Sequence, residues 1–184
     1  MPPYAELHCI SNFSFLKGAS HPEEMVERAK TLGYRAIAIT DECSFAGIVR
    51  AHVAAQAVDI QLLIGSEFRL QEGTRFILIA KNRSGYGYIA NLISTARRRA
   101  PKGDYYLSHK DFVETESNCI AVWLPNAEAL QEIQTKEIAW LKNYFENQVW
   151  IGVTQLLINH ESRQTHILEQ LSQITMTPLV AIGS

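Results

Sequence analysis

The sequence predicts an α/β fold in which a mainly parallel sheet or barrel carries its helices on the outside. Three observations support this prediction. Short apolar runs alternate with longer amphipathic segments along almost the whole chain. Most of the runs are apolar at consecutive positions, as expected of strands that are buried on both faces. No linker, repeat or low-complexity stretch interrupts the alternation, so residues 1–184 are expected to form one domain.

The expected strands are short apolar or alternating runs bounded by turn-forming residues. They are 4–10, 35–40, 60–65, 67–70, 75–80, 119–124, 149–154 and 178–182. In a βα barrel, the residues that follow the carboxyl end of a strand form the functional face. Because the chain stops at "TPLVAIGS", directly after the last of these strands, we expect a C-terminally truncated barrel that lacks its final unit.

The first helix is expected in "GASHPEEMVERAKTLGY". Ser20 and Glu23 have the spacing of a capping box, Pro22 suits the first turn, and Gly33 suits the position after the last turn. A second helix, 44–58, is expected to be capped by Ser44, although Gly47 weakens that prediction. The remaining expected helices are Gly85–Arg98, a short one at Ser108–Asp111, and two longer ones at about 127–145 and 160–175.

The composition is that of a soluble globular protein, with 47% hydrophobic and 20% charged residues. A net charge of −2 gives no whole-chain sign of a nucleic-acid or membrane partner. The three cysteines lack CxxC spacing, which favours reduced thiols over a disulfide framework or a zinc ribbon. With no signal-peptide pattern and no apolar run of membrane-spanning length, we expect a cytoplasmic protein.

Polar side chains stand near the carboxyl ends of three expected strands. His8 lies in "ELHCI", Asp41 and Glu42 in "AITDEC", and Glu67 in "LIGSEF". On a parallel α/β scaffold these ends converge, and an imidazole with carboxylates can bind a divalent metal such as Mn²⁺ or Zn²⁺. Such a metal could activate water for phosphoester hydrolysis.

Each of these residues also has a simpler interpretation. His8 could be a hydrogen-bonded, half-buried side chain, Asp41 could cap the turn before the Ser44 helix, and Glu67 could pair with a nearby arginine. A second feature is the basic stretch "ARRRAPKG", which contains Arg97, Arg98, Arg99 and Lys102. It is interpreted either as a solvated helix end or as a patch that contacts phosphates or a partner protein.

The segment "ELHCISNFSFLKGASHPEEMVERAKTLGYRAIAITDECSFAGIVRAH" resembles the opening of the PHP (polymerase and histidinol phosphatase) domain of bacterial C-family, polymerase III α-like, DNA polymerases. More narrowly it resembles the error-prone, damage-induced (ImuC-type) branch. "LLIGSEFRL", "FILIAKNRSGYGYIANLISTARRRAPKG" and "CIAVWLPN" continue the resemblance over nearly the whole chain. The resemblance implies a distorted (β/α)7 barrel at the N-terminus of a much larger polymerase.

The resemblance also implies a set of metal ligands, and this sequence keeps only part of it. The family's H-x-H motif is "HCI" here, so His8 matches and Ile10 replaces the second histidine. The D-H motif is "DE", so Asp41 matches and Glu42 replaces the histidine, while the following glutamate matches Glu67.

The closing D-x-H motif of the family would follow "PLVAIG", where only Ser184 remains. With so few matching ligands, the resemblance implies at most one weakly held divalent metal (Mn²⁺, Zn²⁺ or Mg²⁺). It therefore favours a structural domain over a working three-metal phosphoesterase.

Three functions follow from these observations. The first is a non-catalytic N-terminal domain that supports an error-prone DNA polymerase and contacts DNA or other subunits of a mutagenesis complex. The second is a metal-dependent phosphoesterase or 3′–5′ exonuclease that uses His8, Asp41 and Glu67. The third is a free-standing α/β protein that binds a partner through the basic stretch.

Overall fold

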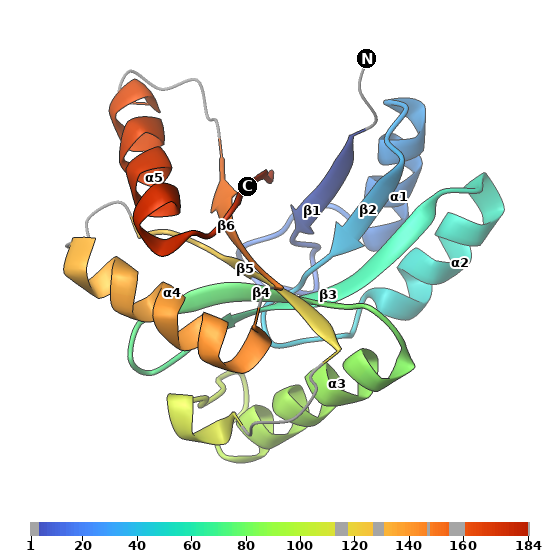
Figure 1. Ribbon diagram of the computed structural model, residues 1–184. Helices are drawn as coiled ribbons and strands as arrows, with labels where there is room; N and C mark the ends of the chain where they lie inside the picture. The colour runs from blue at the N-terminus through green and yellow to red at the C-terminus, as the bar shows by residue number, and fades with distance from the viewer. Residues whose placement is uncertain (1–3, 113–117, 127–130, 147, 155–160, 184) are drawn as a thin grey trace.

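The computed structural model describes residues 4–112, 118–126, 131–146, 148–154 and 161–183, with side chains from residue 165 onward in the last range. Within these ranges, seven strands form one curved sheet whose spatial order is the order of the chain (Figure 1). They are β1 (Ala5–Cys9), β2 (Ala36–Ile39), β3 (Gln61–Arg69), β4 (Arg75–Ala80), β5 (Cys119–Trp123), β6 (Val149–Val153) and β7 (Leu179–Ala181).

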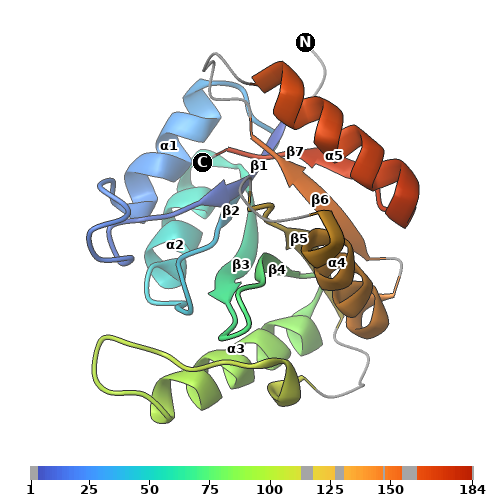
Figure 2. The same ribbon diagram turned by 90° about the vertical axis from the view of Figure 1, so that its left-hand side faces the viewer.

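Most neighbouring strands of the sheet are parallel. The β1–β2, β2–β3, β5–β6 and β6–β7 pairs are parallel, whereas β4 runs antiparallel to both β3 and β5. The two outer strands, β1 and β7, come together, and the Gly183 N–H donates to Glu6 Oε1 at 2.7 Å (Figure 2). The sheet is therefore a nearly closed seven-stranded barrel, and the predicted α/β barrel is confirmed.

Helices surround the barrel on its outside (Figure 1). Those in the described ranges are α1 (Pro22–Thr31), α2 (Ile48–Val58), α3 (Arg83–Arg98), the 3₁₀ helix η1 (His109–Asp111), α4 (Gln131–Phe145) and α5 (Glu161–Thr175). The predicted helical residues 127–130 and 160 lie outside the described residues. In the part of the chain that the structure describes, no helix is long and apolar enough to cross a bilayer.

Both faces of the sheet are buried, which explains why the strands are apolar at consecutive positions. On β4, Ile77 and Ile79 belong to the apolar cluster inside the barrel, together with residues of β2 and β5. Phe76 and Leu78 belong instead to the larger cluster beneath α3 and α4. Burying both sets of side chains stabilises the fold by about 25 cal/mol for each Å² of apolar area removed from water. This free energy favours packing of the helices on the sheet.

The first helix begins one residue later than the predicted capping box requires. Its N-cap is His21 rather than Ser20, and the His21 N–H donates to Glu24 Oε2 at 2.8 Å rather than pairing with Glu23. Ser20–Glu23 and His21–Glu24 share the same x-x-Glu spacing, although serine is the commoner cap. Pro22, as the first helical residue, fixes which of them the backbone uses.

Two further helix starts differ from the prediction. α2 is capped by Gly47 and not by Ser44, whose hydroxyl instead accepts the Ala46 N–H at 3.1 Å in a local turn. α3 begins before the predicted Gly85, because the Asn82 side chain accepts the Gly85 N–H at 3.1 Å and caps the helix.

The predicted strands 60–65 and 67–70 form one continuous strand, β3. Its first part, to Ile64, pairs in parallel with β2, and its second part, from Gly65, pairs antiparallel with β4. The change of partner explains why one long strand looked like two short ones. Glu67 therefore lies within a strand and not directly after one.

Candidate functional site

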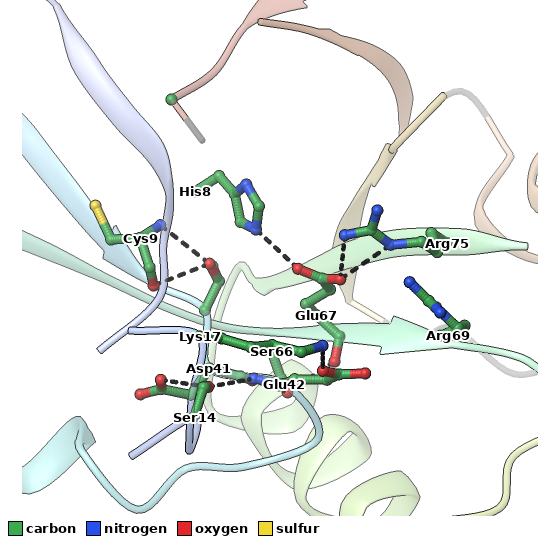
Figure 3. Close-up of polar contacts among 12 residues, drawn as sticks. His8, Cys9, Ser14, Lys17, Asp41, Glu42, Ser66, Glu67, Arg69 and Arg75 are labelled. Atoms are coloured by element: carbon green, nitrogen blue, oxygen red, sulfur yellow. Dashed lines mark hydrogen bonds and ion pairs between the residues drawn. The ribbon is translucent and has the colours of Figure 1, made fainter. Parts of the chain in front are cut away.

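The predicted site residues lie where β1 and β2 end and β3 changes partner (Figure 3). His8 is the last residue but one of β1, and Asp41 follows β2. Glu67 lies in the part of β3 that continues past the end of β2. The structure brings His8 and Glu67 into direct contact. Asp41 makes its contacts with a different set of residues, so the three predicted ligands do not share one centre.

Glu67 is a buried carboxylate held by charged or chargeable partners. Its side chain is 2% exposed. His8 Nε2 lies 2.9 Å from Oε2, and Arg75 donates to Oε1 from Nη2 at 2.7 Å and from Nε at 3.2 Å. Burial would raise the pKa of Glu67, but the hydrogen bonds from His8 and Arg75 outweigh it and lower the pKa to about 2. The ion pair confirms the simpler interpretation, that Glu67 pairs with an arginine.

Asp41 is a buried carboxylate held by neutral donors, and the residue is 1% exposed. Oδ1 accepts the Ser11 N–H at 2.9 Å and the Ser14 hydroxyl at 2.7 Å, while Oδ2 accepts the Ser11 hydroxyl at 2.7 Å. All three donors come from the loop between β1 and α1. The interpretation that Asp41 caps the turn before the second helix is therefore wrong, because its carboxylate fastens an earlier segment of the chain.

Glu42 points away from Asp41 and is also paired. Its carboxylate forms an ion pair with Lys17 and accepts the Tyr105 hydroxyl at 2.8 Å. Its backbone carbonyl accepts Arg97 Nη2 at 3.1 Å. Burial and the neighbouring Glu42 charge raise the pKa of Tyr105, so the phenol stays protonated and acts as a donor.

This donor set does not fit a divalent metal. Within the described ranges, no three His, Cys, Asp or Glu side chains lie close enough together to hold an ion. The hydrogen bonds of Glu67 and Asp41 occupy both oxygens of each carboxylate. A metal at Glu67 would also have to stand beside the Arg75 guanidinium, which already neutralises that carboxylate. The predicted weak metal site thus remains a prediction without support from this geometry.

A small cavity opens beside the His8–Glu67–Arg75 triad. It has a volume of about 180 Å³, and His8, Arg75, Gly152, Thr154 and Ile182 are among the residues that line it. The His8 side chain is 8% exposed, and its buried Nδ1 has no hydrogen-bond partner among the residues that the structure describes.

Of the four residues in the predicted basic patch, Arg97 is bonded within the protein and the other three are exposed. Arg97 turns inward and donates to the carbonyls of Cys43, Gly103, Asp104 and Glu42, at distances between 3.1 and 3.2 Å. Its guanidinium also lies 5.4 Å from the centre of the Tyr105 ring. Arg97 is therefore a clamp between α3 and two loops.

The other three basic residues face solvent. Arg98 donates to the Ser94 carbonyl one turn earlier in its own helix, and Arg99 pairs with Asp111. Lys102 is exposed. These side chains match the solvated helix end of the simpler interpretation, and contact with nucleic acid remains a prediction for them.

The cysteines supply no nucleophile. Cys43, which follows the two acids, is fully buried with φ at 46°. Burial raises the pKa of Cys9, Cys43 and Cys119 to about 12 each, so the thiols stay protonated at neutral pH.

Arg75, Ser11 and Ser14 were not among the predicted site residues. Arg75 had a detectable signal, because a hairpin between the segments around 67–70 and 75–80 places it diagonally across from Glu67. In that hairpin Glu67 lies opposite Ile77, two residues from Arg75. Ser11 and Ser14 lie in a loop with no periodic pattern, so nothing in the sequence pointed from them to Asp41.

Comparison with known proteins identifies a family for this chain. The family model described as "PHP domain" matches residues 6–170. The chain is 46% identical over 180 residues to a protein of Saccharophagus degradans and 47% identical over 184 residues to a protein of Pseudomonas aeruginosa, both named "Error-prone DNA polymerase". The matches cover 98% and 100% of this chain but only 17% of each relative.

A solved structure shares the fold. An amidohydrolase from Chromobacterium violaceum superposes with a TM-score of 0.74 over 98% of this chain and 86% of its own, at 16% sequence identity. At that identity the likeness concerns the barrel alone.

Proposed function

This chain belongs to the PHP domain family, and we propose that it is the PHP region of an error-prone DNA polymerase that acts in damage-induced mutagenesis and translesion DNA synthesis. One observation carries the proposal. The chain matches such polymerases at 46–47% identity over nearly all of its length, while spanning only 17% of theirs. Nucleotide addition would then belong to the part of the polymerase that lies outside the matched region.

Within that polymerase we assign the chain a supporting and non-catalytic role. The reason for this assignment is that the carboxylates of the site are already paired. Glu67 is neutralised by Arg75, Asp41 is saturated by hydroxyl and amide donors, and Glu42 is paired with Lys17. A hydrolytic site needs carboxylates free to hold a metal or to accept a proton, and these are already occupied.

The proposed partners are the remainder of the polymerase, DNA, and other subunits of a mutagenesis complex, all in the cytoplasm. If DNA touches this domain, the exposed Arg98 and Lys102 are better placed to bind phosphates than Arg97, whose donors are used internally.

A metal-dependent phosphoesterase or 3′–5′ exonuclease is the second candidate. The contact between His8 and Glu67 and the cavity that His8 and Arg75 line favour it. It would require Arg75 to leave Glu67 when a metal binds, and for that reason we rank it below the supporting role.

A chimera tests the proposal. This chain would replace the matching region of the Pseudomonas aeruginosa relative, and primer extension on undamaged and lesion-containing templates would be compared with that of the parent polymerase. We expect extension within about threefold of the parent, because 47% identity over the whole chain preserves the barrel. A soluble, folded chimera with no polymerase activity would contradict the proposal. So would metal-dependent phosphodiester hydrolysis by the isolated chain that is lost in His8→Ala.

A further inference from the structure

The loop between β1 and α1 exposes two large apolar side chains to solvent. Phe15 is 85% exposed and Leu16 is 90% exposed, and their neighbour Phe13 is 40% exposed. We call residues 13–17 the tip loop. Single exposed apolar residues are common on protein surfaces, but three within four positions of one loop form a patch.

The exposure does not come from a loosely held loop. The buried Asp41 carboxylate binds Ser11 and Ser14 on the near side of the tip. The Ser14 carbonyl accepts the N–H groups of Lys17 at 3.0 Å and Gly18 at 3.1 Å. A Cβ on Gly18 would lie 2.1 Å from the Ser11 carbonyl oxygen, so the turn closes only with glycine at that position. The fold thus uses a buried acid to fix the tip loop in one conformation.

The backbone of the tip loop is also strained. Leu16 has φ at 62°, in the left-handed region that a branched, bulky side chain rarely adopts. Strain of this kind persists where the surroundings enforce it, and it clusters at sites that bind something. Here the left-handed residue carries an apolar side chain that is 90% exposed.

A groove runs beside the tip loop. Its volume is about 610 Å³, and Phe13, Phe15, Lys17, Arg69, Tyr105 and Leu107 are among the residues that line it. The Arg69 guanidinium makes no ion pair with any residue in the described ranges. An occupant of this groove would place an apolar side chain against Phe13 and Phe15 and a carboxylate near Arg69. Leu16 lies outside the groove and would be covered by an adjoining part of the same partner.

We infer that the tip loop and its groove are the surface through which this domain docks onto the rest of its polymerase chain. The inference rests on the proposed function. In the curated relatives the matched region is only 17% of the length, so most of such a chain is available to cover a patch on this domain. A covalently linked partner also explains how an apolar patch is tolerated, because it is covered as soon as the chain folds.

The test uses the chimera with the Pseudomonas aeruginosa relative and the isolated 184-residue chain. Amide hydrogen exchange of residues 13–18 should be slowed about tenfold or more in the chimera relative to the isolated chain. The double variant Phe15→Ser/Leu16→Asn should release the domain from the chimera about tenfold faster under limited proteolysis. Asparagine tolerates the left-handed conformation, so the isolated variant domain should melt no lower than the wild type.

The matched control is Val53→Ser, because Val53 is an apolar side chain on α2 that is 62% exposed. Its release rate should stay within about twofold of the wild-type chimera. Equal exchange of residues 13–18 in both proteins, or an equal effect of Val53→Ser, would overturn the inference. So would a dimer of the isolated chain that the double variant abolishes, since the occupant would then be a second copy.

The outcomes also separate this inference from the proposed function. A wild-type chimera without polymerase activity would overturn the proposed function. An active chimera that is indifferent to Phe15→Ser/Leu16→Asn would overturn only the docking surface.

Discussion

Asp41 and Glu67 are both buried carboxylates at the same end of the barrel, yet they are held in opposite ways. Asp41 accepts only neutral donors, all from one loop. Glu67 is held by His8 and by the Arg75 guanidinium, which come from two different strands. The family resemblance seen in the sequence implies, as a prediction, that both acids stand at metal-ligand positions. The comparison shows two ways to satisfy an acid at such a position without a metal.

The difference also assigns the two acids different tasks. Asp41 has no cationic partner and holds one loop in place, so replacing it should destabilise the tip loop locally. Glu67 forms a charged cross-link between β1 and β4 at the mouth of the barrel, so its removal should be felt by the whole fold. The following predictions test this division, from the largest expected effect to the smallest.

Arg75→Met should cause the largest loss of stability. It leaves the buried Glu67 carboxylate without its cation, which should lower the free energy of unfolding by about 3 kcal/mol at neutral pH. Urea unfolding measures the loss. The double variant Arg75→Met/Glu67→Gln should recover most of it, because no buried charge is then left unpaired. A single variant within about 0.5 kcal/mol of wild type would show that the ion pair is not structural.

The stability of the wild type should fall in acid through Glu67. Its folded pKa, about 2, lies below its ordinary value of 4.5, so its contribution is present above about pH 4.5 and disappears as the pH falls toward 2. That contribution is at most about 3 kcal/mol. Urea unfolding of wild type and Glu67→Gln at several pH values measures this contribution. The difference between their free energies of unfolding should become smaller in acid. A difference that does not depend on pH would contradict this assignment.

Asp41→Asn should have a smaller and more local effect. One oxygen becomes an amide nitrogen facing the Ser11 hydroxyl, which can turn to accept, so the cost is about 1–2 kcal/mol. Hydrogen exchange of residues 11–18 should accelerate more than that of β4. Ser14→Ala is the comparison variant, since it removes one of the three donors to Asp41 and the acceptor of the Glu42 N–H. Uniform acceleration across the barrel would mean that Asp41 supports the whole fold rather than the loop.

Lys17→Met should change the free energy of unfolding by less than about 0.5 kcal/mol. The Lys17–Glu42 ion pair sits near the surface, with the lysine side chain 47% exposed, and Tyr105 still donates to Glu42 when the lysine is removed. Thermal unfolding in low and high salt measures the effect. A loss comparable to that of Arg75→Met would show that the Lys17–Glu42 pair supports the fold as strongly as the Glu67–Arg75 pair does.

Sequence patterns predicted a mainly parallel sheet or barrel because buried strands leave consecutive apolar residues, as in "RAIAIT" and "RFILIA", and the family resemblance implied the barrel. They also placed His8, Asp41 and Glu67 at the same end of the barrel, since strand ends converge in a parallel fold. They could not show which partners each acid uses. Arg75 reaches Glu67 through the register of an antiparallel hairpin, and the sequence reading had separated the two halves of β3.

The contacts of Asp41 could not be predicted from the sequence for a different reason. Ser11 and Ser14 lie about 30 residues earlier, in a turn whose closure depends on Gly18, and loops of this kind carry no periodic signal. The shifted helix caps have a similar origin. At α1 Pro22 fixes the start one residue after the predicted cap, and at α2 the Ser44 hydroxyl is used in a local turn instead.

Calorimetric titration of the metal-free wild-type chain with Mn²⁺ and with Zn²⁺ tests the central claim most directly, the claim that the acids at this end of the barrel are satisfied within the protein. We predict no stoichiometric binding that depends on His8 or Glu67, because their donors are already committed to each other and to Arg75. Binding of one or more equivalents with a Kd in the micromolar range, lost in both His8→Ala and Glu67→Gln, would contradict the account.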